Sequence, residues 1–175
     1  MRHGPLVALF VILLMVAVSF VVGTSGALPE RVASHFDATG LANGYMTRDG
    51  YRLFMLAFSL GFPLLMVALI SWLPRLAPGL TNIPNRAYWF APERRETTFA
   101  TLEAYALQLG CLLTVMAGGV HWLVIRANGV APPRLENAPF LALLGAFLAV
   151  LTLWIVMLLR RFRKTPYSNL RSRQQ

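Results

Sequence analysis

The sequence predicts an all-α integral membrane protein, with four transmembrane helices in an antiparallel bundle and a small ordered extracytoplasmic loop module. Composition and patterning predict this class. Of the 175 residues, 57% are hydrophobic and 13% are charged, and the apolar residues fall in long, unbroken blocks. A soluble helical protein keeps charged side chains along the outer face of each helix. These blocks lack such a face and are long enough to cross a bilayer.

The apolar blocks predict helices at about residues 5–24, 52–73, 98–125 and 139–159. The first block starts near a basic residue and ends in small residues, as cleaved signal peptides do. Its apolar core exceeds the roughly 7–15 residues of a signal peptide. We therefore expect a retained helix, and cleavage within residues 1–27 is the alternative. Pro63 removes a backbone hydrogen bond inside the second block and should kink that helix.

Charge sets the expected orientation. In the four-helix topology, both termini and the 74–97 loop share one side of the membrane. Eleven arginines and lysines fall on that side and five on the other. Basic residues are enriched on the cytoplasmic side of membrane proteins. We therefore expect both termini, the 74–97 loop and the basic 160–175 tail in the cytoplasm, and the 25–51 loop outside. The net charge of +9 reflects this bias and indicates no nucleic-acid partner.

The outer loop, residues 28–52, is the candidate functional segment because it is long, rich in turn-forming residues and ionisable. One interpretation is structural: Phe36 and Leu41 pack on the bundle, while His35 holds the turns through the backbone. In the other, the loop binds an extracytoplasmic peptide or protein. Its candidate binding or loop-structuring residues are His35, Phe36, Asp37, Gly40, Asn43 and Gly44, of which Gly40 and Asn43-Gly44 are expected in turns.

A metal site is a further alternative, with His35, Asp37 and His121 as ligands and Glu30 as a fourth. The spacing of these residues matches no zinc pattern, and the single cysteine offers no thiolate cluster. We therefore predict no metal and no cofactor.

The cytoplasmic loop at 74–97 is rich in proline, aromatic residues and arginine. We expect it to lie at the membrane interface, and binding of a cytoplasmic partner is the alternative. Its candidate residues are Asn82, Asn85, Tyr88, Trp89, Arg94 and Arg95.

The third block contains the intramembrane polar residues Glu103, Gln108 and His121. Glu103 and His121 are eighteen residues apart, which is five helical turns, so they share one face. We expect Gln108 to make an interhelical hydrogen bond. Small residues along the third and fourth blocks permit close helix packing, in a homodimer as well as in a compact monomer.

A family resemblance follows from the outer loop. Leu28-Pro29, His35-Phe36, Gly40 and Asn43-Gly44-Tyr45 follow directly after a first transmembrane helix. Residues 5–73 therefore resemble the bacterial domain of unknown function 1648, the N-terminal domain of SdpI-type immunity membrane proteins, in a short four-helix branch. The resemblance implies a multi-pass protein of the bacterial cytoplasmic (inner) membrane, with roles in toxin immunity or signalling.

Two functions remain open from the sequence. The first is a non-enzymatic protein that binds an extracytoplasmic partner through residues 28–52. The second is a membrane-embedded enzyme or small transporter that uses Glu103, His121 and His35. The sequence disfavours the second because it lacks a metalloprotease motif, paired intramembrane carboxylates and a glycine-rich phosphate loop.

Overall fold

The computed structural model describes residues 3–165. Arg2 and residues 166–175 of the basic tail lie outside the described residues. The described part is mostly helical, as predicted, and four of its helices are long and apolar enough to cross a membrane. They are α1 (Gly4–Ser25), a continuous span from Arg48 to Leu76, α5 (Arg95–Asn128) and α6 (Asn137–Arg163).

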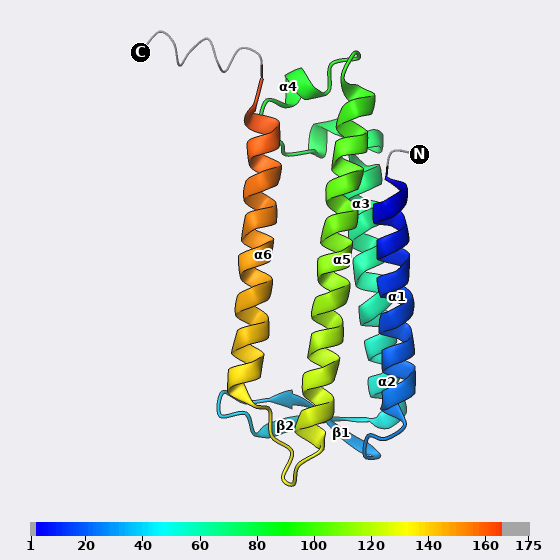
Figure 1. The fold of residues 1–175 in the computed structure, drawn as a ribbon, viewed down its shortest axis with the longest axis vertical. Coiled ribbons are helices and arrows are strands. Elements are labelled where there is room, and N and C mark those ends of the chain that lie inside the picture. Colours follow the sequence, from blue (N-terminus) through cyan, green and yellow to red (C-terminus); the bar gives the residue numbers. More distant parts are fainter. Residues whose placement is uncertain (1–2, 166–175) are drawn as a thin grey trace.

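The long helices lie side by side, and each runs opposite to the next along the chain (Figure 1). The start of α1 and the end of α6 lie at one end of the assembly, and two short strands lie at the other. Helix α5 is central because α1, α6 and the second span all pack on it. Gly110 permits the close approach: a Cβ there would lie 2.7 Å from Val67 Cγ2 and 2.8 Å from Phe10 Cε2.

The second span contains three consecutive helical segments. They are α2 (Arg48–Leu56), the π-helix η1 (Ala57–Gly61) and α3 (Phe62–Leu76). The π-helix ends at Gly61, two residues before Pro63. Proline has no amide hydrogen, so it interrupts the regular hydrogen bonds of the helix. A π turn accommodates such an interruption. The span begins earlier than expected because Thr47 caps it, accepting a hydrogen bond from the Gly50 amide at 3.1 Å.

The outer loop contains a β-hairpin that the all-α prediction did not include. Strand β1 (Arg31–Phe36) pairs antiparallel with β2 (Ala42–Thr47). The prediction of a turn at Asn43-Gly44 was wrong, because both residues lie within β2. The chain reverses at residues 37–41 instead. Two register shifts near His35 mark bulges in the pairing, and bulges bend a strand and re-aim its side chains.

Short helices fold the loop at the opposite end. They are the 3-10 helix η2 (Pro78–Leu80) and α4 (Arg86–Trp89). Helix α5 starts at Arg95, three residues before the predicted start at about residue 98. Residues 91–95 form a separate turn, in which the Arg94 and Arg95 amides donate to the Ala91 carbonyl at 2.9 and 3.0 Å.

Candidate functional site

Asp37 builds the hairpin turn. Its Oδ1 accepts hydrogen bonds from the Thr39 hydroxyl at 2.7 Å, the Thr39 amide at 2.8 Å and the Leu41 amide at 3.1 Å. The Thr39 hydroxyl, and after it these amides, hold the pKa of the Asp37 carboxyl below its ordinary value, because they stabilise the charged form. Asp37 is therefore a structural residue, and it has the turn-holding role that we expected of His35.

The hairpin tip is docked on the loop between α5 and α6. The Leu135 amide donates to the Gly40 carbonyl at 2.8 Å, and Leu41 forms a β-bridge with Arg134. Gly40 has φ +84°, and a Cβ at this position would clash with the Leu135 carbonyl oxygen. Glycine satisfies both constraints, since it tolerates positive φ and has no Cβ.

Asn128 closes the free edge of β1. Its Oδ1 accepts from the Ala33 amide at 2.8 Å, and its Nδ2 donates to the Ala33 carbonyl at 2.9 Å and to the Val124 carbonyl at 2.9 Å. The carboxamide thus pairs with Ala33 as a neighbouring strand would. Ala33 is fully buried, so these bonds satisfy backbone groups that water does not reach.

The edge of β2 is closed at one end only. The Ala42 amide donates to the Pro133 carbonyl at 3.4 Å. Because the Ala33 backbone groups point away from β2, those of its partner Tyr45 point away from β1. Within residues 3–165 the outward amide and carbonyl of Tyr45 have no hydrogen-bond partner outside the hairpin. The hairpin therefore offers an open strand edge beside its docked tip.

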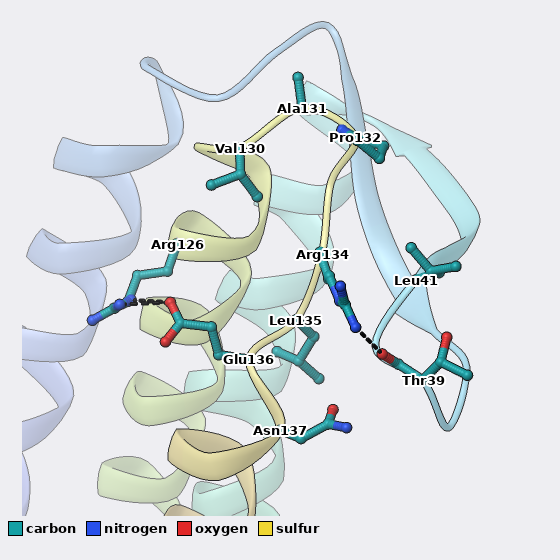
Figure 2. A pocket seen from close by; sticks show the side chains of 10 residues that line it. All are labelled: Thr39, Leu41, Arg126, Val130, Ala131, Pro132, Arg134, Leu135, Glu136 and Asn137. Atoms are coloured by element: carbon teal, nitrogen blue, oxygen red, sulfur yellow. Dashed lines mark hydrogen bonds and ion pairs between the residues drawn. The ribbon is translucent and has the colours of Figure 1, made fainter.

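A cleft of about 610 Å³ lies between the hairpin tip and the α5–α6 loop (Figure 2). Its apolar wall includes Leu41, Val130 and Pro132, and its polar wall includes two arginines and Glu136. Glu136 is paired with Arg126 at 2.5 Å. The Arg134 guanidinium donates to the Thr39 carbonyl at 3.4 Å and forms no salt bridge within the described residues. The cleft therefore combines apolar surface with an unneutralised cation.

A buried hydrogen-bond chain holds the helices beneath the hairpin. His121 is fully buried, with Nδ1 2.9 Å from the Tyr51 hydroxyl and Nε2 2.8 Å from Thr24 Oγ1. The Thr24 hydroxyl donates to the Phe20 carbonyl at 2.6 Å, so it accepts from His121 Nε2–H. Nδ1 then accepts from the Tyr51 hydroxyl. The imidazole is fully bonded and joins α1, α2 and α5.

Of the six predicted loop residues, His35, Asp37 and Asn43 have exposed side chains. Phe36 packs against the buried cluster below the hairpin, as the structural interpretation expected. Gly44 lies under His35, since a Cβ there would approach His35 Cβ to 2.9 Å. The histidine hydrogen-bonds the Ser34 hydroxyl at 3.1 Å rather than the turn backbone.

The candidate metal ligands do not converge. His121 is enclosed between helices instead of reaching the outer surface, while His35 and Asp37 are exposed on the hairpin. Within residues 3–165, no three histidine, cysteine, aspartate or glutamate side chains are placed to share a metal ion.

The constellation proposed for an enzyme or transporter does not form either. Glu103 and His121 lie about 27 Å apart along α5 at 1.5 Å per residue. Glu103 pairs with Arg75 at 3.4 Å, and both side chains are more than a third exposed. Since His121 is fully hydrogen-bonded, the two share no reaction site. Gln108 is exposed and forms no interhelical hydrogen bond within the described chain, so the bond we expected for it is not formed.

The 74–97 loop caps the C-terminal end of α6. Trp89 Nε1 donates to the Phe162 carbonyl at 2.7 Å, and Asn85 Nδ2 donates to the Phe162 and Arg163 carbonyls at 3.1 Å each. Trp89 is buried against the Phe162 ring. The last carbonyls of a helix lack partners within it, and these two side chains supply them.

Other candidates of this loop keep accessible groups. The Arg94 guanidinium stacks 4.0 Å from the centre of the Tyr88 ring, and Asn82 and Arg95 are exposed. The loop is thus part of the folded protein, with a polar surface at its rim.

Sequence reasoning missed the residues of the α5–α6 loop. The important ones are Asn128, which pairs with β1, and Arg134 and Leu135, which hold the hairpin tip. The predicted helices at about 98–125 and 139–159 leave this segment only as the connection between them. The Asn-Gly pair at its start marked a helix end but carried no information about a contact nearly a hundred residues away.

Comparison with known proteins identifies one segment. No curated protein and no solved structure matches the chain. A family model, described as Domain of unknown function (DUF1648), matches residues 10–67, which cover most of α1, the hairpin and most of the second span. The predicted resemblance to domain of unknown function 1648 is thus confirmed over residues 10–67.

Proposed function

We propose that this chain is a multi-pass membrane protein that binds an extracytoplasmic peptide or protein at its hairpin end. The observation that carries the proposal is the cleft between the hairpin tip and the α5–α6 loop. Its volume of about 610 Å³ lies in the range of ligand sites, and such sites combine apolar walls with a few polar groups.

Rigid support favours this site over a merely flexible loop. Asn128 fixes β1, the Gly40–Leu135 hydrogen bond fixes the tip, and the His121 chain fixes the helices below. A preformed surface loses less conformational freedom on binding. The open edge of β2 adds a second element, because an extended peptide can join an exposed strand through its main chain.

The orientation belongs to the same proposal. It is supported by the eleven basic residues on the side of the termini against five on the hairpin side, since basic residues are enriched on the cytoplasmic side. The hairpin then lies outside a bacterial inner membrane, with both termini in the cytoplasm. Helix α1 is retained in this proposal, since Thr24 bonds His121 and Phe10 packs at Gly110. Immunity to a secreted antibacterial peptide, or signalling of its presence, is the role implied by the SdpI resemblance.

A survival assay tests the proposal. The full chain is expressed in a sensitive bacterium and challenged with secreted antibacterial peptides. Val130→Trp fills the cleft from an exposed position, and Ala38→Trp adds the same bulk at the hairpin tip, outside the cleft. We expect protection by the wild type and by Ala38→Trp, and its loss in Val130→Trp at equal membrane levels.

A third variant separates the cleft from the outer face of the hairpin. Loss of protection in His35→Ala alone would move the binding surface to that face. Protection that survives Val130→Trp and His35→Ala together would refute binding at the hairpin end. A wild type that protects against none of the peptides would count against immunity, and photo-crosslinking from position 130 would then test partner binding directly.

A further inference from the structure

Gln108 exposes a carboxamide near the middle of a membrane span. Helix α5 runs from Arg95 to Asn128, so Gln108 lies about 5 Å along the axis from the midpoint of the helix. Its side chain is exposed and forms no hydrogen bond within residues 3–165. Hydrocarbon offers a carboxamide no hydrogen-bond partner, and an unpaired polar group there costs several kcal/mol per group.

The surface beside Gln108 is an apolar groove between α5 and α6. Leu112 and Val115 follow Gln108 at intervals of one and two turns, which places them on the same face. With Ala146 and Val150 of α6 they line a cavity of about 170 Å³ that is wholly apolar. The small side chain of Ala146 lets a neighbouring helix approach closely.

Helix α6 leaves this side of the protein uncovered. It lies at the edge of the assembly (Figure 1), and Phe162 near its inner end is its one buried residue within the described chain. Within residues 3–165 the cavity is lined by residues of α5 and α6 alone, and Gln108 stays exposed beside it. A hydrogen-bond partner for Gln108 must therefore come from outside residues 3–165 and must offer both a donor and an acceptor at mid-membrane depth.

We propose that a second copy of this chain covers the α5–α6 groove, with the two Gln108 carboxamides hydrogen-bonded to each other across a two-fold axis. A carboxamide is self-complementary because it carries both a donor and an acceptor. In a two-fold dimer the same surface patch meets itself, so one residue supplies both halves of the bond. The inference requires that α5 spans the bilayer and does not depend on peptide binding at the hairpin.

Disulfide cross-linking of the full chain in membrane vesicles tests the arrangement. Cys111, the native cysteine, is first replaced by alanine. Val115→Cys then reports the proposed interface, while Met15→Cys on α1 and Leu65→Cys on α3 are exposed controls near the middle of their own spans. We expect a covalent dimer from Val115→Cys under mild oxidation and none from the controls. Equal cross-linking at all three positions, or none from Val115→Cys, would overturn the proposal.

A second measurement tests the hydrogen bond itself. Gln108→Leu, added to Val115→Cys, removes the carboxamide from an exposed site, so each copy should still fold. Interhelical hydrogen bonds in membranes are worth about 0.6–2 kcal/mol, so dimer affinity on dilution into excess lipid should fall about threefold to thirtyfold. Gln108→Asn, which keeps the carboxamide, should restore part of the affinity. An unchanged or tighter dimer in Gln108→Leu would refute the Gln108 pair.

Discussion

Replacing Asn128 by alanine tests whether the α5–α6 loop holds the hairpin. The variant leaves both backbone groups of the fully buried Ala33 without the partners they have at 2.8 and 2.9 Å. A buried polar group left unsatisfied costs about 1–3 kcal/mol, and water entering the gap recovers part of this. We therefore expect a local destabilisation of about 2–4 kcal/mol for the two groups.

Hydrogen exchange of the Ala33 amide, measured on the full chain in lipid nanodiscs, reports this effect. A loss of about 2–4 kcal/mol should accelerate exchange about 30-fold to 1,000-fold. Amides in the middle of α5 should stay protected, since the change is local. Asn43→Ala is the matched control, because Asn43 is exposed on β2. An Ala33 amide that exchanges equally slowly in Asn128→Ala would refute the strand-like role of this side chain.

Three further predictions follow from the turn and cap geometry. Gly40→Ala should loosen the hairpin tip and speed its proteolysis, while Gly26→Ala, at φ −64° with open space around it, should not. Asn85→Gly should destabilise the end of α6 by about 1 kcal/mol, because it removes the side-chain hydrogen bonds. Asn85→Ala should cost about 1–2 kcal/mol more, because φ is +55° at this position. Hydrogen exchange at the end of α6 measures both effects. The pKa of Asp37 is lowered in the folded state, so its stabilisation is present above the ordinary carboxyl pKa and is lost as pH falls through the folded value. Opening of the turn at low pH, measured at the Thr39 amide, should therefore vanish in Asp37→Asn, and a wild-type amide insensitive to pH would contradict this role.

The sequence by itself determined the number and approximate position of the spans. Whether a segment crosses the membrane depends on the mean hydropathy of about twenty consecutive residues and little on which helix packs beside it. The DUF1648 resemblance was also readable, because its residues lie in one continuous loop. Gly40 could be assigned to a turn, since glycine is the residue that tolerates positive φ at low cost.

The tertiary structure decided what each polar residue does. The sequence placed His121 and Glu103 on one face, yet His121 is satisfied by Thr24 and Tyr51 and Glu103 by Arg75, and these partners belong to other helices. The strand edge closed by Asn128 was equally invisible, because a hydrogen bond between residues distant in the chain depends on how the helices pack. Local pattern fixes which segments cross the membrane, and the helix packing fixes which polar groups remain free to bind.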